Sequence, residues 1–176
     1  LNYPLQLALT PLVGAVAAGN TVVLKPSESA PKTGAIVAQI IEETFPKEWV
    51  TVVEGGAAVA QELLEFSWDY IFYTGSTTVG KLVAQAAAKH LTPTTLELGG
   101  KCPCIVEDSA PIKSTAKRIV WGKFLNCGQT CIAPDYVLVS PHKKEALMNA
   151  LKKEIIHAFG ENPAKSKDYG RIINEI

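Results

Sequence analysis

Cys131 is one of four cysteines in the sequence, and it closes the polar run Asn126–Cys131. A thiol has a pKa of about 8.5 and needs local help to ionise at neutral pH, after which it becomes a strong nucleophile. Most cysteines, however, are inert small apolar residues. On residue type alone, a structural role is therefore favoured for all four cysteines.

Glu97 is an acid set between two leucines in the segment Leu96–Gly100, at the end of an expected strand. Desolvation by apolar neighbours would raise the pKa of such a carboxyl and make it a better base near neutral pH. The alternative is a simple alternation along the strand, with Glu97 pointing to solvent.

Two further groups of residues follow expected strands. Lys25 and Glu28 come directly after the first strand, where a carboxylate that accepts and an ammonium that donates would suit ribose hydroxyls. The alternative is a solvated helix cap made by Ser27 or Ser29.

Gly75–Gly80 joins a strand to a helix, and a helix N-terminus offers free N–H groups to an anionic pyrophosphate. The run lacks the middle glycine of the G-x-G-x-x-G fingerprint, so phosphate binding and a plain tight turn both stay open.

Other arrangements of the same residue types are disfavoured. Cys102-x-Cys104 and Cys127-x3-Cys131 lack the C-x2-C spacing typical of four-thiolate zinc sites, so no metal is predicted. The histidines His90, His142 and His157 are scattered, which argues against a Cys–His hydrolase. An even number of cysteines permits disulfides, but reduced thiols are expected.

Short β-branched runs alternate with longer helical patterns, which predicts parallel strands in an α/β fold. Leu5–Ala18 is expected to be a buried helix with a bend. Further helices are expected at 32–44, 57–65, 77–89, 112–124 and 143–159, and strands at 21–24, 50–53, 70–73, 94–98, 104–106 and 136–139. The alternation of strands and helices starts again after Gly99-Gly100, which predicts a domain boundary there. An active site is then expected in the crevice between the two domains.

Length and charge narrow the class of protein. The 176 residues suffice for one domain or parts of two, and no apolar run reaches the roughly 18 residues of a bilayer span. Seventeen basic and 17 acidic residues give zero net charge, which argues against nucleic-acid binding. The first residue is Leu1, and we expect the sequence to be an internal fragment.

The order of the motifs along the chain resembles the aldehyde dehydrogenase superfamily. The segments that carry this resemblance are 2–4, 19–28, 72–80, 96–101 and 128–131. Within the superfamily, the amino acids at 89–93, 128–136 and 160–163 are similar to those of the class 3 and fatty aldehyde dehydrogenase branch. The resemblance implies part of a Rossmann-like NAD(P)-binding domain at 1–98 and the start of an α/β catalytic domain at 99–176.

The resemblance also implies roles for individual residues. Cys131 matches the nucleophile, Glu97 the base that activates water, and Asn2 the side chain of the oxyanion hole. Lys25 and Glu28 match the adenosine-ribose contacts. The residues that match the nucleotide-binding turn are Gly75, Ser76 and Gly80.

The resemblance implies NAD(P)-dependent oxidation of aldehydes to carboxylic acids through a thiohemiacetal and a thioester. NAD is the expected cofactor, with NADP also accepted. The whole protein is expected to be a homodimer in the cytoplasm or on the cytoplasmic face of an intracellular membrane, held there only by a tail outside this sequence. The fragment alone is expected to be inactive. The alternatives are a non-catalytic fragment or pseudoenzyme, and a dehydrogenase that transfers the acyl group to coenzyme A.

Overall fold

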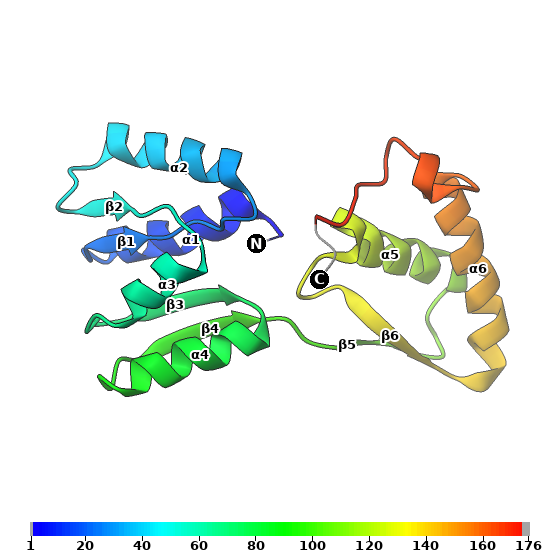
Figure 1. The fold of residues 1–176 in the computed structure, drawn as a ribbon. Coiled ribbons are helices and arrows are strands. Elements are labelled where there is room, and N and C mark those ends of the chain that lie inside the picture. Colours follow the sequence, from blue (N-terminus) through cyan, green and yellow to red (C-terminus); the bar gives the residue numbers. More distant parts are fainter. Residues whose placement is uncertain (1, 174–176) are drawn as a thin grey trace. The chain divides into compact units, whose positions relative to one another are not determined.

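The computed structural model describes residues 2–173, and the chain divides into two compact units, Leu1–Leu98 and Gly99–Ile176. The first unit contains two parallel strand pairs and the second contains one. In each pair the two strands are joined through a helix (Figure 1). The assignment of these parts as NAD(P)-binding and catalytic domains stays a prediction.

The first strand pair of the first unit joins β1 (Val22–Leu24) and β2 (Val50–Val52) through helix α2 (Pro31–Thr44). Helix α1 (Pro4–Ala17) precedes β1 and packs with α2 and β1. Apolar side chains spaced along these helices face the strands and form a core. Its buried residues are Leu12, Val37, Ile41 and Val50.

Helix α1 corrects one expectation, since it is not a buried helix. Only Ala8 and Leu12 are buried in it, and Val13 is 66% exposed. Pro11 lies inside the helix without ending it. Within this chain one face of α1 packs on α2 and β1, and the other face is open.

The second strand pair contains β3 (Ile71–Gly75) and β4 (Thr94–Leu98), joined by α4 (Thr77–Ala88), and α3 (Ala57–Leu64) packs on α4. In its register Thr74 pairs with Glu97 and Gly75 pairs with Leu98. The end of β4 that carries Glu97 therefore lies beside the strand-to-helix turn at Gly75.

The second unit pairs β5 (Cys102–Val106) with β6 (Pro134–Val139) through α5 (Ile112–Phe124) and the 3-10 helix η1 (Leu125–Gly128). Helix α6 (Pro141–Phe159) and the 3-10 helix η2 (Pro163–Lys165) follow. Val106, Ala116 and Leu147 form the buried core where α5 and α6 pack together.

The α/β class and the order of the elements are confirmed. The strands do not join one sheet: among the described residues they form three separate parallel pairs. Helix α6 begins at Pro141, two residues before the expected start, because proline at the first helical position is pre-set for a helix. No helix in residues 2–173 is long and apolar enough to cross a membrane.

Candidate active site

Lys25 and Glu28 lie together at the carboxyl end of β1. Their side chains form an ion pair at 3.2 Å, and the Lys25 ammonium also donates to the Pro26 carbonyl at 3.1 Å. The Lys25 side chain is 16% exposed and that of Glu28 is 55% exposed. Its own backbone N–H first, and then Lys25, hold the pKa of the Glu28 carboxyl below its usual value. The pair thus presents an ionised acceptor beside a fixed cation.

The alternative, in which Ser27 or Ser29 caps the following helix, is wrong. Helix α2 begins at Pro31, its N-cap is Ala30, and no side chain caps it. The Ser27 hydroxyl instead accepts from the Ser29 backbone N–H at 3.4 Å. Proline at the first helical position fixes where the helix starts, three residues beyond Glu28.

The Gly75-Ser76 turn opens α4. Ser76 is the N-cap, and its hydroxyl accepts from the Val79 backbone N–H at 3.3 Å. The Tyr73 hydroxyl lies where a Cβ on Gly75 would stand, and it accepts hydrogen bonds from Ser76. Burial, first of all, raises the pKa of the Tyr73 phenol above its usual value. Tyr73 is thus a polar member of this turn that was not among the predicted site residues.

Gly80 is buried against the strand that carries Glu97. A Cβ at this position would come within 2.7 Å of Leu98 Cδ2, closer than real side chains approach. The glycine therefore lets α4 pack closely on the end of β4. Its contact with a cofactor stays a prediction.

Glu97 is exposed in the structure, between the half-buried Leu96 and Leu98. Side chains alternate along a strand, and this alternation turns the carboxylate away from the face that packs on α4. The apolar neighbours in sequence therefore do not bury Glu97 within the described residues.

Asn2 is half-buried and directly precedes helix α1. Beside this helix N-terminus lies an apolar hollow of about 440 Å³. Its lining residues are Tyr3, Pro4, Leu5, Gln6, Leu9 and Thr33.

Cys131 lies in an exposed turn directly before β6. Three consecutive residues before it adopt positive φ: Asn126 at 52°, Cys127 at 59° and Gly128 at 78°. Only glycine takes this conformation without steric cost, so the loop holds two non-glycine residues in an unfavourable backbone. On its other side, the Cys102 thiol donates to the Cys131 carbonyl at 3.3 Å. The loop therefore has a defined, supported shape.

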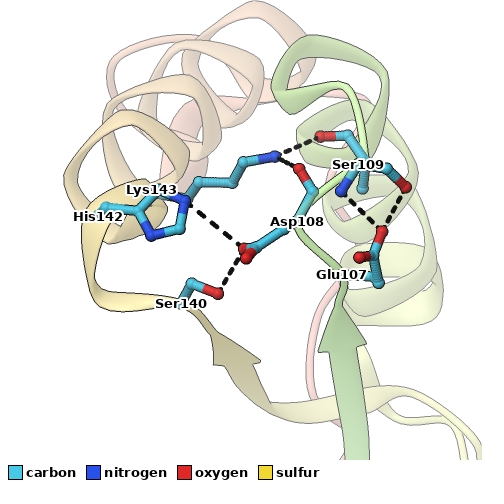
Figure 2. Close-up of polar contacts among 7 residues, drawn as sticks. Glu107, Asp108, Ser109, Ser140, His142 and Lys143 are labelled. Carbon is cyan, nitrogen blue, oxygen red and sulfur yellow. Dashed lines mark hydrogen bonds and ion pairs between the residues drawn. The ribbon is translucent and has the colours of Figure 1, made fainter.

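A polar cluster marks the opposite end of the same strand pair, after β5 and β6 (Figure 2). Asp108 accepts from the Ser140 hydroxyl and lies 3.6 Å from His142 Nε2, and the Lys143 ammonium donates to the carbonyls of Asp108 and Ala110. Ser140 donates to the carboxylate rather than to His142, so these residues do not form a nucleophile–base pair. The cluster ties the start of α6 to the β5–α5 loop.

The predicted site residues fall into two groups. The first unit contains Asn2, the ion-paired Lys25 and Glu28, and the turn of Gly75, Ser76 and Gly80 beside β4 and Glu97. The second unit contains Cys131. Among the described residues no group of three His, Cys, Asp or Glu side chains could hold a metal ion.

Fold and site together define an α/β protein with an exposed thiol before one strand and a serine-capped strand-to-helix turn after another. The model of the aldehyde dehydrogenase family matches residues 1–176. The chain therefore belongs to the aldehyde dehydrogenase family.

Individual relatives agree with this assignment. Human aldehyde dehydrogenase family 3 member B1 is 52% identical over 174 residues, which are 99% of this chain and 37% of the relative. Mouse "aldehyde dehydrogenase, dimeric NADP-preferring" is 49% identical, again over 99% of this chain and 38% of the relative. The solved structure of a Mycobacterium tuberculosis aldehyde dehydrogenase complexed with NAD⁺ matches with a TM-score of 0.88 at 31% identity, over 99% of this chain and 37% of that one. The chain thus spans well under half of the proteins that it matches.

Proposed function

We propose that the protein containing this chain oxidises aldehydes to carboxylic acids with NAD(P)⁺, and that Cys131 is its nucleophile. The observation that carries the proposal is the exposed thiol on a shaped loop, in a chain that belongs to the aldehyde dehydrogenase family. Exposure gives an aldehyde access to the sulfur, and a fixed loop lowers the entropic cost of attack.

The chemistry follows from the groups that the chain supplies. The Cys131 thiolate attacks the aldehyde carbon to form a thiohemiacetal, whose oxygen the Asn2 amide stabilises as negative charge develops. Bound NAD(P)⁺ would supply the hydride acceptor that turns this adduct into a thioester. Glu97 then takes a proton from water, the hydroxide attacks the thioester carbon, and the carboxylic acid leaves as the Cys131 thiolate is regenerated.

The first unit fits such a cofactor. The ionised Glu28 can accept from ribose hydroxyls while Lys25 donates, and the N-terminus of α4 at Ser76 can receive a pyrophosphate. The two relatives of known cofactor, one NADP-preferring and one solved with NAD⁺, support use of either dinucleotide. We propose NAD as the preferred cofactor, because a carboxylate at Glu28 repels a 2′-phosphate.

The segments 89–93, 128–136 and 160–163, which are similar to the fatty aldehyde dehydrogenase branch, suggest the kind of aldehyde. We therefore propose aldehydes with apolar tails, such as fatty aldehydes. Comparison of kcat/KM for short and long straight-chain aldehydes measures this preference, which equal values would contradict.

Assembly and location are further proposals for the whole protein. A homodimer is supported by the word "dimeric" in the name of the mouse relative. A cytoplasmic location, or one on the cytoplasmic face of an internal membrane, would keep the Cys131 thiol reduced and reactive.

The deciding experiment uses the full-length protein. Incubation with an aldehyde and NAD⁺ should produce NADH and carboxylic acid, and acid quenching during turnover should trap an acyl group on the peptide that contains Cys131. Added coenzyme A should not accelerate turnover, which separates water from a thiol as the acyl acceptor. A folded protein that binds NAD⁺ yet forms no NADH with any of a panel of aldehydes would refute the proposal.

A further inference from the structure

Gln129 lies two residues before Cys131, and its side-chain amide forms hydrogen bonds on both sides. Its Nε2 donates to the Asn126 carbonyl at 3.0 Å and to the Arg171 carbonyl at 3.3 Å. Its Oε1 accepts from the Ile173 backbone N–H at 3.2 Å. Both amide protons are thus used, and the amide joins the Cys131 loop to a segment 42 to 44 residues further along the chain.

At the Cys131 end of this connection, hydrogen bonds between Gln129 and Asn126 support the unfavourable backbone of the loop. The Asn126 carbonyl that Gln129 Nε2 contacts also accepts from the Gln129 backbone N–H at 3.1 Å. The Asn126 side-chain amide in turn donates to the Gln129 carbonyl at 3.3 Å. Left-handed conformations at Asn126 and Cys127 persist only where surrounding contacts enforce them, and these reciprocal hydrogen bonds span that stretch.

The far side is anchored in the packed part of the second unit. The Tyr169 ring packs on Phe159 and Phe124, at the ends of α6 and α5, with centroid distances of 4.8 and 6.2 Å. The Arg171 guanidinium donates to the Ala164 carbonyl at 2.6 Å and to the carbonyls of Tyr169 and Gly170. The segment 169–173 therefore has supports of its own and does not depend on Gln129 for its place.

Gly170 provides a second contact between the two sides. A Cβ at this position would lie 3.1 Å from Cys127 Sγ, so any larger residue would press on the loop. The nucleophile loop is thus held by one amide and by one close backbone contact, both from the same downstream segment.

We propose that Gln129 is a positioning residue that sets the backbone of Cys131 by fastening its loop to the segment 169–173. The inference rests on the proposed function, in which Cys131 attacks the aldehyde. Gln129 acts through the loop and does not touch the reacting atoms. Its loss therefore changes the rate of the chemical step rather than the binding of the aldehyde or cofactor.

The test compares Gln129→Met with Gln39→Met in the full-length protein. Methionine keeps the length of the side chain but removes all three of its hydrogen bonds. Gln39 is a matched control, since its amide donates to Glu43 at 2.8 Å on an exposed face of α2. A displacement of the thiol by about 1 Å can cost roughly a hundredfold in rate. We expect kcat to fall by about that factor in Gln129→Met, with KM for the aldehyde and Kd for NAD⁺ unchanged, and no change in Gln39→Met.

The rate of Cys131 alkylation by iodoacetamide, measured as a function of pH, provides a second readout. This pH profile would not change if Gln129 only stabilised the fold away from Cys131. The profile should shift in Gln129→Met and stay at the wild-type position in Gln39→Met. Wild-type kcat and a wild-type alkylation profile in a folded Gln129→Met protein would overturn the proposal.

Gln129→Glu covers the case in which Gln129→Met does not fold. Its carboxylate can still accept from the Ile173 backbone N–H but cannot donate to the carbonyls of Asn126 and Arg171, so kcat should fall at unchanged KM. A wild-type kcat in folded Gln129→Glu would overturn the proposal. The proposed function is tested separately by Cys131→Ser: if that variant keeps full activity, the proposed function fails, whereas loss in Cys131→Ser with wild-type Gln129→Met removes only the positioning role.

Discussion

The two units hold their chemical groups by contacts of very different range. In the first unit, Lys25 contacts Glu28 and Ser76 contacts Val79, each three residues along the chain. In the second unit, the Cys131 loop is held by Cys102, Arg171 and Ile173, which lie 29, 42 and 44 residues from their partners. Each of the two turns in the first unit is thus made by one strand–helix junction, whereas the Cys131 loop combines local hydrogen bonds with contacts to residues distant along the chain.

The largest effect is expected when the Cys131 thiol is removed, which tests the difference between the two units. Cys131→Ser should lower aldehyde-dependent NADH formation by roughly a thousandfold or more, because a serine hydroxyl without an adjacent base is a weak nucleophile. Kd for NAD⁺ should not change, since the residues proposed to bind the cofactor lie in the first unit. Stopped-flow and binding titrations of the full-length protein measure the two quantities.

Cys127→Ser is the matched control for this substitution. Cys127 belongs to the same loop, but its sulfur lies next to Gly170 and has no assigned role in the reaction. It should retain turnover within a few-fold of wild type. Equal losses in both variants would show that the loop, rather than the Cys131 sulfur, is what the reaction needs.

Glu97→Gln should have the next largest effect. Loss of a general base costs about a hundredfold or more in the step that it serves. Because acylation of Cys131 does not need this base, steady-state turnover should slow while a first-turnover burst of NADH survives. A folded variant that binds NAD⁺ and shows no burst would place Glu97 earlier in the reaction, at formation of the thiolate.

Glu28→Gln should change cofactor preference by a smaller factor. Removing the carboxylate removes the repulsion of a 2′-phosphate. The ratio of kcat/KM with NAD to kcat/KM with NADP should therefore fall by roughly three- to tenfold. The rate of the chemical step with saturating NAD should stay the same. A wild-type protein at least as efficient with NADP as with NAD would refute the preference itself.

The smallest effect is expected for Glu107→Gln, which changes the free energy of unfolding through the polar cluster after β5. The Ser109 hydroxyl first, and then the Ser109 backbone N–H, hold the pKa of the Glu107 carboxyl below its usual value. A lowered folded-state pKa stabilises the fold above the unfolded pKa, and this contribution disappears as the pH falls through the folded one. Glu107→Gln should therefore unfold slightly more easily than wild type at pH 7, and the difference should be smaller at pH 3. Urea denaturation at both pH values checks the expectation, and a difference that grows toward acid would contradict it.

The range of contacts also explains what the sequence could predict. The strand Thr94–Leu98 and the helix Ile112–Phe124 have the predicted bounds, because periodicity and propensity are local properties. The Lys25–Glu28 pair lies within one turn of the chain and could likewise be anticipated. The signal for Tyr73 was also local, since a tyrosine two residues before a glycine can fold back over it.

Other features depend on information that local patterns do not carry. The exposure of Glu97 follows from which face of β4 packs on α4, and leucines on either side in sequence do not decide this. The partners of Gln129 could not be anticipated either, because nothing in Asn126–Cys131 points to residues beyond Lys165. The start of α2 was predicted within one residue, but the sequence did not show that Ser27 and Ser29 form a local turn rather than a helix cap.

The distance between Gln129 and its partners has a consequence for biosynthesis. A ribosome that adds about 5–20 residues per second needs roughly 2 to 9 seconds to travel from Gln129 to Arg171 and Ile173. During that interval the newly made thiol is carried on a loop without its downstream support. Reagents that react with exposed thiols would therefore meet Cys131 in nascent chains in a different setting from the one in finished protein.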